Sequence, residues 1–125
     1  EDLLVAVALG KESLEGKLDP DRVNILTMHQ AKGLEADVVF LMAAEDEIMP
    51  RAESAAAVED DRRLLYVSMT RAKERLFITY SGLRTGPQMY SGRNPSERRR
   101  TLTRFLRGGP LRVTPGGPFI QAWDR

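Results

Sequence analysis

Nine consecutive residues bring together four polar side chains that suit a charged ligand. Residues 27 to 35 read TMHQAKGLE and include the only histidine of the chain. Thr27 and His29 can hydrogen-bond to phosphate or sugar groups, and Lys32 adds a positive charge. Glu35 can accept hydrogen bonds from the hydroxyl groups of a ribose. These residue types suit contact with a nucleotide or a nucleic acid.

The same residues also have a plainer, structural interpretation. A lone histidine beside a strand is commonly structural, and Lys32 and Glu35 have the spacing of an ordinary i,i+3 surface pair. Composition alone favours this interpretation. One histidine without a second histidine or a cysteine cannot build a zinc site, so no metal is expected. No geometry for a catalytic triad can be argued from the sequence.

Two hydrophobic runs must position this polar segment. Val23 to Met28 and Asp37 to Met42 are rich in Val, Ile, Leu and Phe over short lengths, which predicts two β-strands. Neither run alternates cleanly, which favours strands buried on both faces in a parallel sheet. Gly33 supplies the turn between them, because glycine tolerates a positive φ or the close approach of another backbone. The polar segment would then lie at the carboxyl end of a strand, where α/β sheets bind their ligands.

A second charged cluster lies on a predicted helix. Residues 53 to 73 are strong helix formers without Gly or Pro, and apolar residues recur in them at helical spacing. Arg62 and Arg63 follow two aspartates and are interpreted as structural ion pairs. Arg71, near the helix end, can project from the domain, where a guanidinium suits bidentate contact with phosphate oxygens. Judged alone, a terminal arginine of this kind is more often just solvated.

The remaining segments complete an α/β pattern. In chain order, the sequence predicts a helix end over 1 to 9, a loop over 10 to 21, a strand over 76 to 80 and a surface loop over 82 to 96. Ser96 is expected to cap a final helix, SERRRTLTRFLRG. We therefore expect one α/β domain over residues 1 to 107, with a mostly parallel sheet covered by helices, and a flexible tail over 108 to 125.

Composition and charge narrow the class of protein. Hydrophobic residues make up 42% of the 125 residues and charged ones 30%, as in soluble globular domains, and no apolar run approaches the roughly 20 residues that cross a bilayer. The absence of cysteine suits a cytoplasmic location. Residues 1 to 62 carry 6 basic and 15 acidic residues (net −9), whereas residues 63 to 125 carry 13 and 3 (net +10). The basic half can attract phosphates, although solvation or pairing with the acidic half is the commoner outcome.

No phosphate-binding loop of the form G-x-x-x-x-G-K-[ST] occurs in the sequence. Any role in phosphoryl transfer must therefore be as the second half of a site, and we expect this chain alone not to hydrolyse ATP. The sequence begins at Glu1 without a methionine or a signal peptide, which we interpret as either a trimmed chain or a domain cut from a longer protein.

Taken together, the two charged clusters resemble motifs of the UvrD/Rep-like family of superfamily 1 DNA helicases, in the second RecA-like motor domain. VNILTMHQAKGLEADVVFL, within about residues 22 to 42, is similar to motif V of that family. EDDRRLLYVSMTRAKERLFIT, residues 59 to 79, is similar to motif VI. Two such motifs in this order and spacing outweigh the structural interpretation of each cluster. Two positions depart from the family pattern: Ala36 stands where an aromatic residue is frequent, and Glu47 where glycine is.

The resemblance implies a role for each residue of the two clusters. Arg71 would reach the γ-phosphate of ATP as an arginine finger, and Glu35 would contact the ribose. Thr27 and His29 would contact the DNA. Lys32 and Gly33 would couple the nucleotide and DNA sites.

The implied function is that of the C-terminal motor domain of an ATP-dependent DNA helicase. Its partners would be single-stranded DNA and the first RecA-like domain, which would supply the phosphate-binding loop and hold the Mg²⁺ of ATP. No membrane partner is expected. The alternative is a helicase-like module that binds single-stranded DNA or a protein without ATP chemistry. A phosphate-binding loop in a longer parent sequence would distinguish the two.

Overall fold

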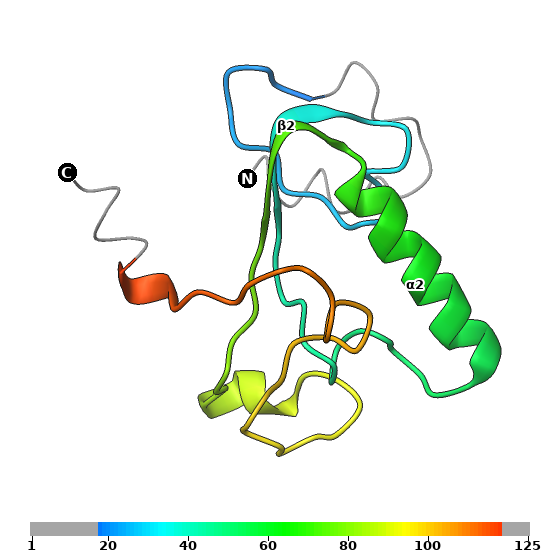
Figure 1. Ribbon diagram of the computed structural model, residues 1–125, viewed down its shortest axis with the longest axis vertical. Coiled ribbons are helices and arrows are strands. Elements are labelled where there is room, and N and C mark those ends of the chain that lie inside the picture. Colours follow the sequence, from blue (N-terminus) through cyan, green and yellow to red (C-terminus); the bar gives the residue numbers. More distant parts are fainter. Residues whose placement is uncertain (1–17, 119–125) are drawn as a thin grey trace.

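Two parallel strands and the helix that connects them form the regular part of the computed structural model, which describes residues 18 to 118 (Figure 1). The elements are, in chain order, β1 (Ala36–Leu41), α2 (Ala55–Met69), β2 (Ala72–Ile78) and the 3₁₀ helix η1 (Gly86–Tyr90). β1 and β2 pair in parallel. This strand, helix, strand unit confirms the predicted α/β class and the parallel sheet.

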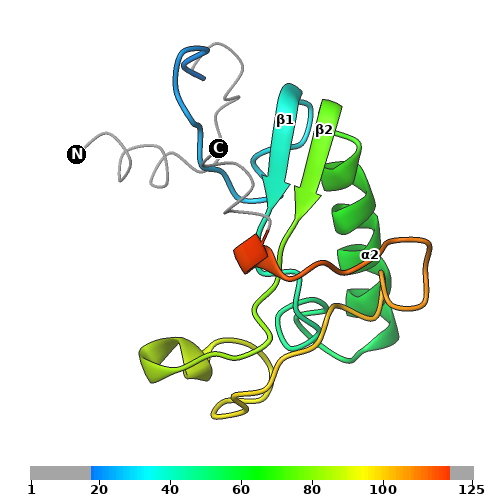
Figure 2. The same ribbon diagram turned by 60° about the vertical axis from the view of Figure 1, so that its left-hand side comes forward.

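The two faces of β1 differ in burial. Val39 and Leu41 are half-buried, whereas Val38 and Phe40 are 43% and 55% exposed. Phe40 stacks on Phe77 of β2, with ring centroids 4.6 Å apart. Helix α2 runs along one side of the strand pair (Figure 2). The prediction that both faces of the strands are buried is therefore wrong for β1, because every second side chain of this strand is open to solvent.

Helix α2 follows from local sequence. Ser54 caps its first turn, with the Oγ accepting a hydrogen bond from the N–H of Ala57 at 3.3 Å. Leu65 and Ser68 are buried on its inner side. The helix is confirmed but shorter than the predicted span of 53 to 73. It ends at Met69 because the chain already enters β2 at Ala72.

The predicted strand over Val23 to Met28 is wrong for this structure. No regular element covers these residues, and Val23 is 93% exposed. A β-strand needs a neighbouring strand to satisfy its main-chain groups, and within residues 18 to 118 no segment pairs with this run. Hydrophobic composition therefore does not by itself produce a strand here.

The predicted helix from Ser96 is also wrong. Arg99 pairs with Leu83, and Leu102 pairs with Glu45, both as single antiparallel bridges. In the middle of this segment N–H groups bond to distant carbonyls; one example is Thr103 N–H to the Ala44 carbonyl at 2.9 Å. Only at its end do two N–H groups, of Leu106 and Arg107, close a turn on the Thr103 carbonyl. Tertiary hydrogen bonds thus override the local helix propensity.

Ion pairs replace much of the usual apolar core beneath this segment. The acidic loop, residues 45 to 53, places Glu45 and Asp46 at 0% and 7% exposure. Their carboxylates, with that of Glu53, bind a set of arginines that we call the arginine clamp: Arg84, Arg93, Arg104 and Arg107. The pairing of the basic half with the acidic half, one of the outcomes expected from the sequence, is therefore found in the fold.

The acidic loop is fixed to the other elements at two further points. Asp61 of α2 is 1% exposed, and its carboxylate accepts hydrogen bonds from the main-chain N–H and the guanidinium of Arg51. The buried Thr103 hydroxyl donates to the Met49 carbonyl at 2.6 Å. These contacts hold the loop between α2 and the segment 96 to 107.

No helix within residues 18 to 118 has the length and apolar character needed to span a membrane.

Candidate functional site

A capping box organises the first charged cluster. The Thr27 Oγ1 accepts from the N–H of Gln30 at 3.2 Å, and the Gln30 Oε1 accepts from the N–H of Thr27 at 2.9 Å. This reciprocal pair is the arrangement that the spacing T-x-x-Q favours at the start of a helical turn. TMHQ has this spacing, although its threonine was predicted only as a ligand contact.

Gly33 ends this turn in the left-handed region. Its φ is +87°, and the N–H of Leu34 bonds to the Ala31 carbonyl at 3.0 Å. A Cβ at position 33 would meet no atom within 4 Å, so the backbone angle is what requires glycine. Of the two reasons that the sequence allowed for a glycine here, the structure has the positive φ, and no described residue approaches closely.

The turn leaves its polar side chains on the surface. Thr27, His29, Lys32 and Glu35 are all exposed. The Thr27 oxygen is used in the capping box, yet the hydrogen of this hydroxyl can still be donated to a ligand. We call residues 27 to 35 the polar turn. It precedes the amino end of β1, so its predicted place at the carboxyl end of a strand is wrong, because the strand over residues 23 to 28 is not formed.

Arg51 holds the buried carboxylate of α2 in its charged form. Burial alone would raise the pKa of Asp61, but hydrogen bonds from the guanidinium and the main-chain N–H of Arg51 lower this pKa below its ordinary value of 3.8. Eight residues, or about 12 Å of helix, separate Asp61 from the helix end at Met69.

The second charged cluster meets the polar turn at the start of the sheet. The N–H of Ala36 donates to the carbonyl of Arg71 at 3.1 Å. Ala36 and Ala72 are paired in the register of β1 and β2. Glu35 and Arg71 each directly precede one of these paired residues, so their main chains lie side by side at the amino ends of two parallel strands.

The Arg71 side chain folds back over the end of α2. Its Nε donates to the Val67 carbonyl at 3.0 Å, and its Nη2 donates to the Thr70 Oγ1 at 3.1 Å. These bonds satisfy part of the helix terminus, where carbonyls lack helical partners and a positive charge is favourable. Within the described chain the Arg71 Nη1 makes no hydrogen bond, which leaves part of the guanidinium for a ligand.

The structure does not bring every site residue together. In the part of the chain that the structure describes, no contact joins Lys32 to Glu35 or Arg71. A shallow surface hollow lies elsewhere, on α2, lined by Glu59, Arg62, Arg63 and Tyr66. Its two arginines bind the carboxylate of Glu59, as the structural interpretation predicted. Residues 18 to 118 contain no group of three side chains placed to hold a metal ion.

Comparisons with known proteins agree with the two motifs. The family model of the UvrD-like helicase C-terminal domain matches residues 1 to 82. The ATP-dependent DNA helicase PcrA of Bacillus subtilis is 44% identical over 68 residues, which is 52% of this chain and 9% of that protein. The probable DNA helicase II homolog of Mycoplasma capricolum is 42% identical over 87 residues, which is 64% of this chain and 12% of that protein. The ATP-dependent DNA helicase Rep of Buchnera aphidicola (subsp. Acyrthosiphon pisum) is 44% identical over 71 residues, which is 55% of this chain and 11% of that protein. The chain thus spans about a tenth of the length of these relatives.

Proposed function

The chain belongs to the UvrD-like helicase C-terminal domain family, and we propose from this premise that it is the second motor domain of an ATP-dependent DNA helicase. The observation that carries the proposal is the hydrogen bond from Ala36 to Arg71, which sets Glu35 beside Arg71 at the start of the sheet. An exposed carboxylate and a guanidinium with unused donors are the groups that a ribose and a phosphate require. The domain would comprise residues 1 to 107. The predicted helix end over 1 to 9 and the last part of the predicted tail, 119 to 125, lie outside the described residues.

The nucleotide would lie between this domain and a first motor domain. Arg71 would act as an arginine finger, exchanging its bonds to Val67 and Thr70 for oxygens of the γ-phosphate. Glu35 would accept hydrogen bonds from the ribose hydroxyls. The first domain would contribute the phosphate-binding loop and the ligands of Mg²⁺. This division makes the isolated chain inactive as an ATPase.

DNA would contact the polar turn. The exposed Thr27 and His29 would bind the backbone or a base of a single strand, and Lys32 and Gly33 would transmit the state of the nucleotide. The start of the sheet offers a physical connection, because the Arg71 side chain folds over the end of α2 and the Arg71 carbonyl accepts a hydrogen bond from Ala36, the residue after the polar turn. Closure of the domains when Arg71 engages the phosphate would shift this helix and the turn together.

The test is the DNA-stimulated ATPase activity of the parent protein carrying Arg71→Ala. We expect turnover to fall on the order of a thousandfold, because the charge that develops on the transferred phosphoryl group loses its stabilising guanidinium. ATP binding should be largely kept, since most phosphate contacts belong to the first domain. A fluorescent ATP analogue measures this binding.

Arg75→Gln is the matched control, because Arg75 is an exposed arginine of β2. Its turnover should stay close to that of the wild type. Wild-type turnover in Arg71→Ala would remove Arg71 from the reaction. ATP hydrolysis by the isolated 125-residue chain would contradict the incomplete site and the need for a first domain.

A further inference from the structure

The segment from Gly82 to Arg112 is strongly basic, and the fold divides its arginines into two groups. It contains eight arginines and one acidic residue, Glu97. Four arginines form the arginine clamp, and a fifth, Arg100, is 4% exposed and donates its Nη2 to the Met89 and Ser91 carbonyls. The other three have exposed side chains that make no ion pair or hydrogen bond within residues 18 to 118: Arg98, Arg99 and Arg112.

The main chain at two of these exposed arginines is fixed by hydrogen bonds. The N–H of Arg84 donates to the Arg98 carbonyl at 2.9 Å, and Arg99 pairs with Leu83 in an antiparallel bridge. The N–H of Arg100 donates to the Gly82 carbonyl at 3.0 Å. A ligand that binds Arg98 and Arg99 would therefore have only side chains to order, which lowers the entropic cost of binding.

An exposed aromatic ring lies on the segment next to these arginines. Tyr90, the last residue of η1, is 64% exposed. Its neighbours Met89 and Ser91 both accept hydrogen bonds from the Arg100 guanidinium, so the end of η1 is fixed against the segment that carries Arg98 and Arg99. We call Tyr90, Arg98 and Arg99 the basic edge.

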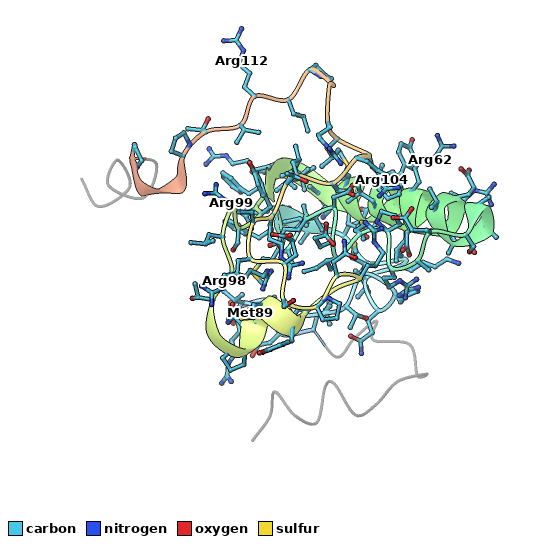
Figure 3. All side chains as sticks on the ribbon, turned by 90° about the horizontal axis from the view of Figure 1, so that it is seen from below. Arg62, Met89, Arg98, Arg99, Arg104 and Arg112 are labelled. Carbon is cyan, nitrogen blue, oxygen red and sulfur yellow. The ribbon has the colours of Figure 1, made fainter. Side chains whose placement is uncertain are left out.

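The basic edge is separate from the charged surface of α2. In Figure 3, Arg98 lies beside Met89 and Arg99 lies on the same side of the molecule, whereas Arg62 lies across it. Arg112 extends away from the body of the protein in the same view, so we leave it out of the edge. Glu97 is the one acidic residue between Gly82 and Arg112. Its carboxylate accepts a hydrogen bond from the main-chain N–H of Arg99 at 3.0 Å, so this acidic group is bound to the main chain.

We propose that the basic edge is a second contact for single-stranded nucleic acid, with Arg98 and Arg99 on phosphates and Tyr90 stacked on a base. This inference rests on the proposed helicase function for its ligand. Exposed guanidiniums and an exposed aromatic ring, here on two segments that the Arg100 guanidinium joins, are the groups by which proteins bind a single strand without reading its sequence. A single strand fits better than a duplex, because only an unpaired, unstacked base offers its face to Tyr90.

The test is binding of the 125-residue chain to a fluorescent oligothymidylate, followed by anisotropy over a series of salt concentrations. In Arg98→Gln/Arg99→Gln, the slope of log K against log salt should decrease by about 1.4, since each phosphate contact to a single strand contributes about 0.7. Tyr90→Ala should weaken binding about tenfold, and Tyr90→Phe should bind like the wild type, because stacking needs the ring and not the hydroxyl.

The matched control is Arg62→Gln/Arg63→Gln, which removes the same charge from the opposite side, where both arginines are paired with Glu59. It should leave the slope unchanged. Equal loss of slope in the two double variants would overturn the inference, because charge alone would then explain binding. So would tighter binding to a duplex of the same length, or no measurable binding by the chain. The helicase proposal is judged separately, by the ATPase activity of Arg71→Ala.

Discussion

The polar turn and the acidic loop are both short, charged connections, yet the fold treats their charges in opposite ways. In the acidic loop, Glu45 and Asp46 are buried and bound by arginines that lie far away in the sequence. In the polar turn, the main chain satisfies itself through a capping box, and the side chains of His29, Lys32 and Glu35 remain on the surface. Similar residue types therefore serve as scaffold in one region and stay available for ligands in the other.

Desolvation explains why the two regions differ. A carboxylate taken out of water is strongly destabilising unless charged and hydrogen-bonding partners replace the lost water. Glu45 has such partners: two nitrogens of Arg84 at 2.6 and 2.7 Å, and the N–H of Ser81 at 3.0 Å. The charges of the polar turn keep their hydration, so leaving them without partners costs little. The comparison predicts where substitutions harm folding and where they harm function.

The largest effect on stability is expected for Glu45→Gln. This substitution leaves the Arg84 guanidinium, whose side chain is 14% exposed, without its charge partner. The free energy of unfolding should fall by about 3 kcal/mol, the lower end of the range for breaking a buried pair. Urea unfolding followed by circular dichroism measures it. In the polar turn, Glu35→Gln should change stability by no more than about 0.5 kcal/mol. Equal costs at the two sites would abolish the distinction between the regions.

A smaller contrast is expected between two glycines with similar backbone angles. Gly33 and Gly92 have φ values of +87° and +97°. An alanine Cβ would meet nothing at position 33, whereas at position 92 it would overlap the main-chain carbonyl of Glu47. Gly33→Ala should cost about 1 kcal/mol, from the left-handed conformation alone. Gly92→Ala should cost roughly 1 to 3 kcal/mol more, because packing strain is added.

Thermal unfolding of the two variants measures this difference. Gly82→Ala is the control, because position 82 has space for a Cβ and no positive φ. A cost at Gly33 as large as that at Gly92 would show that the polar turn is packed as tightly as the acidic loop.

The smallest effect is expected in the pH dependence of stability. Hydrogen bonds from Arg104 hold the pKa of Asp46 well below its ordinary value of 3.8. Burial would raise the pKa of Glu45, but Arg84 and Ser81 lower it below 4.5. The unfolded chain therefore takes up protons first, so stability is full above about pH 5 and is lost as the pH falls through and below 4.

Urea unfolding at a series of acidic pH values tests this dependence. In Asp46→Asn the slope of stability against pH between 3 and 5 should be shallower than in the wild type, because one titrating carboxylate with a lowered pKa is gone. The variant should also be less stable near neutral pH. An unchanged slope would mean that the carboxylate of Asp46 does not contribute to the acid sensitivity.

Much of the regular structure could be read from local sequence. The predicted strand over Asp37 to Met42 corresponds to β1, and the alanine-rich, periodic run after Ser54 is the helix α2. Gly33 was placed correctly because a sharp turn between polar and apolar runs favours a residue that tolerates positive φ. The T-x-x-Q signal of the capping box was equally readable, since it depends on residues only three positions apart.

The wrong predictions have a common physical cause: the hydrogen-bond partners that decide the structure of these segments lie far away in the sequence or are missing. Val23 to Met28 has strand composition, but residues 18 to 118 contain no neighbouring strand for it. The segment after Ser96 has helix-forming residues, but its main chain bonds to residues such as Ala44 and Gly82. Sequence alone also left the arginines between positions 98 and 107 without a role. Their division into the arginine clamp and the basic edge became visible only in the fold.

The sequence by itself determined the motifs, the turn at Gly33 and the helix α2, because these depend on side chains and main-chain groups within a few residues of one another. Only the tertiary structure decided which charges are buried in pairs and which stay on the surface. The partners of Glu45 and Asp46 lie 39 and 58 residues away along the chain. No local pattern encodes such a distance, and an arginine is part of the scaffold or stays exposed according to whether a carboxylate reaches it.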